Sequence, residues 1–285
     1  MGDKWNTAKK LGISMAALML AMLALFGTID NASNGYTEES FKRALVTFGI
    51  ARGLNGVISV AQGTEIAVQP AGVGVNFTPG QILDPINDLV EQFSWVMLAS
   101  SASLGIQKVL LSISSTLLVT ALLVVVFSLY LVSVWRPDWF APGMRKFMIS
   151  SAVIILFVRF SVPLVAIGSE GMYWYFLHDQ YVESSAELEK TKENISEISS
   201  EETQAYGTAD EEGLLEMAKR LMSSASINMS INDRIDKYRE LAAEATRHAI
   251  NLIVVFVIQT ILFPLLFLWL LFRGSKAVWR QLVPI

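Results

Sequence analysis

Arg159 is the residue whose type and position point most directly to a function. It lies near the middle of an apolar stretch, 147–167, that carries no other charge. A charged side chain at the centre of a bilayer costs at least about 2.5 to 3.5 kcal/mol, so it normally faces protein or water. Because an unpaired cation attracts anions or opposes cations along a pore, Arg159 is a candidate pore residue. The alternative is structural, with the side chain reaching the interface or holding helices together.

The partners of Arg159 are expected to be neutral. The chain has four long apolar stretches, and none of them contains Asp or Glu: 11–29, 113–135, 147–167 and 250–272. Gln259 lies at a matching depth and is a second candidate intramembrane polar residue. The remaining candidates are hydroxyl groups and aromatic faces, the latter for cation–π contact: Thr120, Ser128, Ser161, Phe157 and Phe160. Glu170 is a third candidate, since it lies just beyond 147–167 and could neutralise Arg159 from a wet cavity.

A seam of regularly spaced residues leads into the last apolar stretch. Alternating steps of four and three residues are typical of a coiled coil, and they connect Ile231, Ile235, Tyr238, Ala242, Ala245, Ala249, Leu252, Phe256 and Gln259. Ala242, Ala245 and Ala249 are therefore candidates for an oligomer seam or a helix seam. Gln259 should point at another helix, where an amide contributes about 0.6 kcal/mol. The seam predicts one helix that runs from water into lipid.

The sequence offers little for catalysis or for metal binding. It has no cysteine and only two histidines, and it lacks a phosphate-binding glycine loop, a G-x-S-x-G elbow and an H-E-x-x-H motif. We therefore expect no enzyme activity, no cofactor and no metal site. Nucleic acid is also not an expected partner, because the net charge is −4 and the basic residues cluster beside apolar stretches.

The elements that must position these residues are transmembrane helices. Of the 285 residues 53% are hydrophobic and only 17% are charged, against about 25% in soluble domains. A helical span needs about 20 apolar residues, and four stretches qualify: 11–29, 113–135, 147–167 and 250–272. The stretch 93–135 could hold two spans, but that would place the basic residues of 136–146 outside, so we expect one. The sequence thus predicts an all-α integral membrane protein with four transmembrane helices.

Basic residues predict the orientation of these spans. The short segments 1–10, 136–146 and 273–285 hold nine of them, and Lys and Arg accumulate on the cytoplasmic side. Both termini are therefore expected in the cytoplasm, with anionic lipid facing the basic residues and the bacterial inner membrane as the expected location. The basic N-terminus followed by 11–29 resembles a signal peptide, but a long apolar stretch without a small-x-small site favours a retained anchor.

The two long segments, 30–112 and 168–249, are then expected outside. In the first, Thr37 as an N-cap begins a helix that Gly53 and Gly56 end or bend. A short β-hairpin around 70–72 follows. An amphipathic helix from Pro85 is then expected to continue, unbroken or nearly so, into 113–135. The second segment is predicted to be a helical hairpin with its turn at 206–213, continuous with 250–272.

The order of spans and loops resembles that of connexin-like large-pore channels and of tetraspanins. The resemblance covers span order only, and the absence of cysteine departs from the disulfide-bonded outer loops of both groups. Our first hypothesis is a homo-oligomeric channel or pore with a helical ectodomain. The second is a membrane scaffold or accessory subunit whose ectodomain docks another envelope protein.

Overall fold

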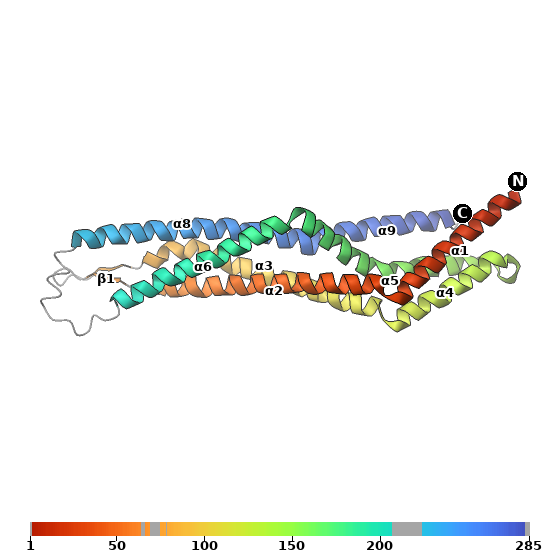
Figure 1. Ribbon diagram of the computed structural model, residues 1–285, viewed down its shortest axis with the longest axis horizontal. Coiled ribbons are helices and arrows are strands. Elements are labelled where there is room, and N and C mark those ends of the chain that lie inside the picture. The colour runs from red at the N-terminus through yellow and green to blue at the C-terminus, as the bar shows by residue number, and fades with distance from the viewer. Residues whose placement is uncertain (1, 64–65, 69–74, 78, 207–223, 283–285) are drawn as a thin grey trace. The chain divides into compact units, whose positions relative to one another are not determined.

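The computed structural model describes residues 2–63, 66–68, 75–77, 79–206 and 224–282. Most of this part of the chain is α-helical (Figure 1). The helices are α1 (Gly2–Phe26), α2 (Thr28–Gly63), α3 (Asp84–Ser114), α4 (Leu117–Trp135), α5 (Pro142–Phe176), α6 (His178–Tyr206), α8 (Ser224–Val257) and α9 (Phe263–Leu282). Pro79–Leu83 and Pro137–Trp139 form short 3₁₀ helices, and Ile258–Leu262 forms a π-helix between α8 and α9.

One pair of short strands interrupts the helical chain. Strand β1 (Ile66–Val68) pairs antiparallel with β2 (Val75–Phe77), and Ile66 lies opposite Phe77. The tip of the expected hairpin, 70–72, lies outside the described residues. The expected turn at 206–213 also lies outside them, apart from Tyr206, which is the last residue of α6.

The chain divides into two compact units. Unit 1 comprises Met1–Lys42, Ser101–Phe176 and Ile258–Ile285. Unit 2 comprises Arg43–Ser100 and Leu177–Val257. Each unit therefore combines segments that are distant in sequence.

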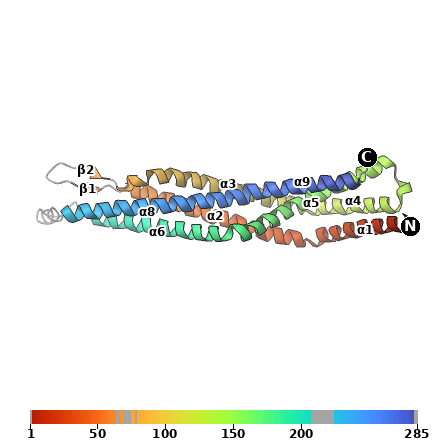
Figure 2. The same ribbon diagram turned by 90° about the horizontal axis from the view of Figure 1, so that it is seen from above.

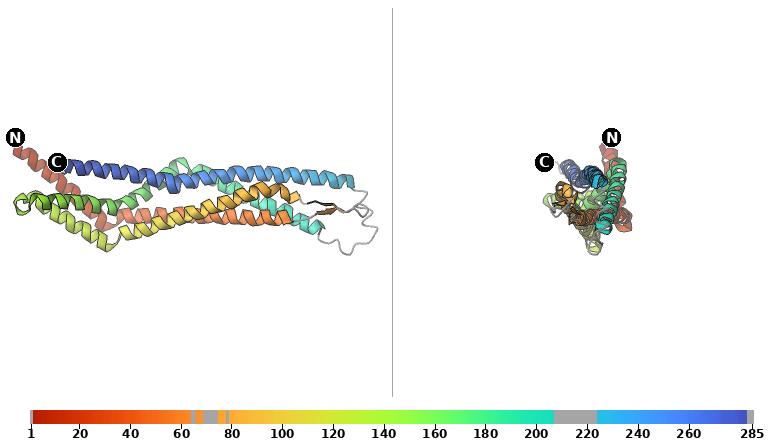
Figure 3. Two further views of the ribbon diagram at one scale, coloured as in Figure 1. Left: turned by 180° about the vertical axis from the view of Figure 1, so that it is seen from behind. Right: turned by 90° about the vertical axis from the view of Figure 1, so that its left-hand side faces the viewer.

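The core of unit 1 forms where α1, α4 and α5 meet. Its buried residues are Ala17 and Ala24 of α1, Leu123 and Phe127 of α4, and Ala152 and Phe160 of α5. Helix α9 packs along α5. The start of α1, the connection between α4 and α5 and the end of α9 lie at one end of this unit (Figures 1 and 3). The three short basic segments of the sequence therefore meet at the same end.

In unit 2, α6 and α8 lie side by side (Figure 2). The buried residues of α6 recur every three or four positions, at Ser184, Leu188, Thr191, Ile195 and Ser199. The ring of Tyr181 on α6 meets the ring of Phe256 on α8 edge to face at 6.0 Å. The two helices thus bury one face each against the other within a single chain.

The number of candidate spans differs from the four that the sequence predicts. Within the described residues, five helical segments are long and apolar enough to cross a membrane: Thr28–Gly63, Gln81–Ser114, Leu117–Trp135, Gly143–Phe176 and Ile235–Arg280. The expected first span falls on α1, where the apolar segment Lys10–Phe26 is shorter. A search for stretches with almost no charge misses α2 and α3, because each of these helices includes charged residues.

Three helix boundaries also differ from the predictions. Thr37 is not an N-cap, since α2 begins nine residues earlier at Thr28 and the Thr37 hydroxyl donates to the Ser33 carbonyl at 2.8 Å. Gly53 and Gly56 do not end this helix, which continues to Gly63. The helix from the first long segment does not run unbroken into 113–135 either, because α3 ends at Ser114 and α4 begins at Leu117.

Candidate functional site

The junction between α1 and α2 is a sharp break at Gly27. This residue has a φ of 63°, a left-handed conformation in which a Cβ is disfavoured. Helix α1 ends one residue earlier, and the amide of Asn31 donates to the Gly27 carbonyl at 2.9 Å in the first turn of α2. Asp30 lies in that same turn, where the positive end of the helix dipole favours a carboxylate.

Arg159 of α5 binds both sides of this junction. Its Nη1 donates to Oδ1 of Asp30 at 2.7 Å, and its Nη2 donates to Oδ2 of the same carboxylate. Nη2 also donates to the carbonyl of Ala24 at 3.1 Å, in the last turn of α1. The guanidinium group therefore satisfies a carbonyl at the end of one helix and a carboxylate at the start of the next.

The expectation of neutral partners for Arg159 is therefore wrong. Arg159 and Asp30 are 1% and 8% exposed, so the pair is almost fully removed from solvent within one chain. Of the expected neighbours, Phe160 lies against Arg159, with its ring centre 5.5 Å from the guanidinium carbon. The sequence did contain a signal, since Asp30 directly follows the apolar stretch 11–29, but 129 residues separate it from Arg159.

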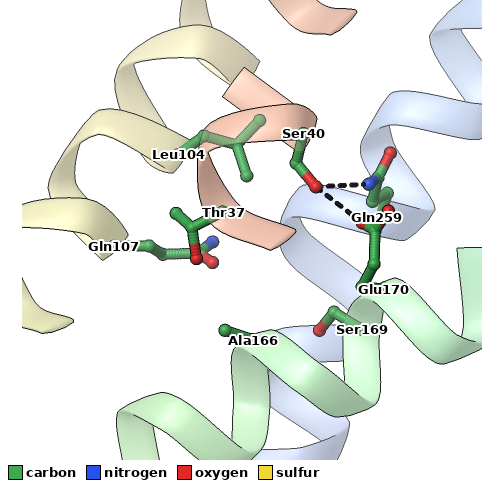
Figure 4. A pocket seen from close by; sticks show the side chains of 8 residues that line it. All are labelled: Thr37, Ser40, Leu104, Gln107, Ala166, Ser169, Glu170 and Gln259. Atoms are coloured by element: carbon green, nitrogen blue, oxygen red, sulfur yellow. Dashed lines mark hydrogen bonds between the residues drawn. The ribbon is translucent and has the colours of Figure 1, made fainter. Parts of the chain in front are cut away.

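Glu170 and Gln259 form a second buried polar site, in which both residues bind Ser40. Nε2 of Gln259 donates to the Ser40 hydroxyl at 3.2 Å, and that hydroxyl donates to Oε2 of Glu170 at 2.7 Å (Figure 4). The three residues come from the π-helix, α2 and α5, and none is more than 5% exposed. Ser40 therefore relays one directed hydrogen-bond chain between the amide and the carboxylate.

A small cavity lies beside these three hydrogen-bonded residues. Thr37 and Ser40 of α2, Leu104 and Gln107 of α3, Ala166, Ser169 and Glu170 of α5, and Gln259 line it. It leaves about 10 Å³ for the centre of a water molecule, close to the room that one water needs. The buried Ser169 hydroxyl has no hydrogen-bond partner in the described part of the chain. One water in the cavity would satisfy it.

The π-helix that carries Gln259 is explained by the proline that follows it. Pro264 follows it and has no N–H to donate to the carbonyl of Thr260, four residues earlier. The Ser103 hydroxyl of α3 donates to that carbonyl at 3.4 Å. Gln259 and Thr260 are buried in this widened turn, and such turns occur frequently at functional sites. The proline therefore helps to place Gln259 at the cavity.

The alanine seam lies in unit 2. Ala245 and Ala249 are fully buried, and Ala242 is partly buried. On the same face of α8, Nδ1 of His248 lies 3.4 Å from the Ser184 hydroxyl of α6. The seam therefore packs against a helix of its own chain.

In the part of the chain that the structure describes, no three His, Cys, Asp or Glu side chains gather as a metal site would require.

The chain matches no protein family model, no curated protein sequence and no solved structure. Its class follows from its helices, because several of them are long and apolar enough to cross a bilayer. The protein is a multi-pass, helical membrane protein.

Proposed function

We propose that the protein is a membrane scaffold or accessory subunit whose unit 2 docks another envelope protein. The observation that carries this proposal is a groove between α2 and α6 with a volume of about 400 Å³. Its lining combines small residues with two valines: Gly53, Gly56, Val57, Val60, Ser196, Ser199 and Ser200. Small residues allow a second helix to approach closely in a membrane.

The geometry of the groove favours an apolar helix as its occupant. A Cβ built on Gly56 would meet no atom within 4 Å, so the groove is open above that backbone. Val60, one turn further along α2, is 61% exposed. Contiguous exposed apolar surface marks interaction sites, and Val57 and Val60 line this groove together. The docking partner is therefore expected to present an apolar face.

The Arg159–Asp30 pair supports the scaffold over the pore. The main argument for a pore was an intramembrane cation without an acidic partner, and this cation is paired and buried inside one chain. A charge that is already neutralised contributes little to ion selection along an axis. We therefore interpret Arg159 as a residue that fixes the α1–α2 junction.

Crosslinking tests the proposal. Because the chain has no cysteine, each single-cysteine variant carries one reactive thiol at a known position. In native membranes, Val60→Cys should crosslink to a distinct protein, whereas Arg239→Cys, on an exposed position of α8, should not. Adding Gly56→Leu, at a position where a Cβ meets no atom within 4 Å, should fill the groove and abolish the Val60→Cys product. Recovery of self-links alone, or a product that survives Gly56→Leu, would contradict docking at this groove.

A homo-oligomeric channel is the second candidate, and the Gln259–Ser40–Glu170 chain favours it. Ionisable groups within apolar segments often mark ion or proton pathways, and here one lies beside a cavity large enough for water. Purified protein in planar bilayers should then conduct, and Glu170→Gln should change the conductance or its selectivity. Silence of the wild type and of Arg159→Leu and Glu170→Gln variants would eliminate this candidate.

A further inference from the structure

We infer that a groove between α5 and α9 binds one acyl chain of an anionic phospholipid, with Arg273 at its phosphate group. The groove has a volume of about 700 Å³. Phe157 of α5 lines one side, and Leu265, Leu266, Trp269 and Phe272 of α9 line the other. All of these side chains are apolar or aromatic, so the groove suits a hydrocarbon chain.

The face of α9 that lines the groove changes from apolar to basic along its length. Leu262, Leu266, Trp269, Arg273, Lys276 and Arg280 follow one another in steps of three or four residues, which places them on one side of a helix. From Leu262 to Arg273 the rise is about 16 Å at about 1.5 Å per residue. Half of a bilayer core about 30 Å thick is about 15 Å. The apolar part of this face therefore matches one lipid leaflet.

The basic end of the groove is arranged to bind a phosphate. The guanidinium carbon of Arg273 lies 5.3 Å from the ring centre of Trp269, which itself lines the groove. Trp is enriched at the level of lipid headgroups, and a guanidinium group binds phosphate through two parallel hydrogen bonds. Helix α9 contains no acidic residue that would compete for Arg273.

One aromatic contact joins the two walls of the groove. The rings of Phe157 and Phe272 meet edge to face at 6.4 Å, which ties α5 to α9 next to Trp269. A second apolar groove, on α1, provides a contrast. It is lined by Met15, Met19, Met22 and Phe26 and reaches Thr28, without a basic residue in its lining. That groove should hold lipid without preference for headgroup charge.

Native mass spectrometry of the full chain in detergent tests the inference directly. Phosphatidylglycerol and phosphatidylcholine with identical acyl chains are supplied as mixed micelles, and retained lipid is counted. The wild type should retain one phosphatidylglycerol in preference to phosphatidylcholine. The Arg273→Gln/Lys276→Gln double variant should lower its affinity roughly thirty-fold, since each basic residue near anionic lipid strengthens binding about fivefold.

Arg136→Gln is the matched control. The guanidinium carbon of Arg136 lies 5.7 Å from the ring centre of Trp139 at the same end of unit 1, but this pair does not line the groove. The control should retain phosphatidylglycerol as the wild type does. This control removes one basic residue, so a loss of about fivefold in it, the amount that one such residue contributes by general attraction, would overturn the specific site.

Leu265→Trp separates the acyl groove from the headgroup contact, because it narrows the groove and leaves Arg273 in place. It should weaken retention of phosphatidylglycerol while leaving the helical circular dichroism and the elution volume unchanged. Unchanged retention in a folded Leu265→Trp variant would overturn the groove. Displacement of the lipid by millimolar glycerol phosphate would show a phosphate site without an acyl chain and would overturn the inference as well.

Discussion

At the scale of single residues, two buried polar contacts of this protein join partners that are distant in sequence. Arg159 meets Asp30 across 129 positions, and Ser40 meets Glu170 across 130. Each contact joins α2 to α5. Removing one partner of a buried pair leaves the other partner without compensation, which costs far more than an exposed ion pair is worth.

We expect Arg159→Leu to lower the free energy of unfolding by about 3 to 5 kcal/mol, because it leaves the carboxylate of Asp30 buried without a cation. Arg159→Lys keeps the charge but cannot form the two parallel hydrogen bonds, so its loss should be smaller. Unfolding in mixed detergent micelles, followed by circular dichroism, measures both. In Asp30→Asn/Arg159→Leu, the loss should be less than the sum of the single losses. Strict additivity would show that the two residues do not interact.

Ser40→Ala should cost about 1 to 3 kcal/mol, because it breaks the chain between Gln259 and Glu170 and leaves buried polar groups without that hydrogen bond. Ser59 on the same helix is the control, since it is exposed and its hydroxyl donates only to the Asn55 carbonyl among the described contacts. Ser59→Ala should leave stability within about 0.5 kcal/mol of the wild type. The same unfolding assay compares them, and equal effects would contradict a role for the buried chain.

At the scale of elements, close helix contacts depend on where a side chain is missing. A Cβ on Gly168 of α5 would lie 2.9 Å from Cζ of Phe267 on α9, whereas a Cβ on Gly171 would meet nothing within 4 Å. One helical turn of α5 thus contains a crowded glycine and an open one. The contact between α5 and α9 matters beyond stability, because these helices also form the walls of the inferred lipid groove.

Gly168→Ala should therefore destabilise the protein by about 1 to 3 kcal/mol, as expected for an overpacked contact. Gly171→Ala should be neutral or stabilising by up to about 1 kcal/mol, because alanine has the higher helix propensity. Thermal unfolding in one detergent gives the order of the two variants. A Gly168→Ala protein as stable as Gly171→Ala would show that α9 moves away from α5 at little cost.

At the scale of the whole molecule, membrane topology is the property with the most direct test. The α4–α5 connection and the end of α9 lie at one end of unit 1. We expect Ala141→Cys and Ala277→Cys to react with a membrane-impermeant maleimide from the same side, the cytoplasmic one, because Lys and Arg accumulate there. Arg239→Cys in unit 2 should react from the opposite side. Labelling of Ala141→Cys and Ala277→Cys from different sides would contradict the shared end.

The sequence predicts some features of this protein well, for reasons of local chemistry. The all-helical, multi-pass character follows from long apolar stretches, and the burial of Gln259 follows from its place on a seam. The number of spans does not follow, because apolar content alone does not separate a span with one or two charges from a half-buried helix. Helices α2 and α3 have this ambiguous character.

The sequence did not determine the partner of Arg159 or the positions of the long helices, whereas the tertiary structure did. Composition and periodicity determined that the chain is helical, lies in a membrane, and carries a costly cation in its third apolar stretch. Tertiary structure alone decided that Asp30 neutralises this cation and that Glu170 instead joins Ser40 and Gln259. The physical reason is that helix formation depends on neighbours a few residues apart, whereas the free energy of a buried charge depends on which side chain packing brings within about 3 Å.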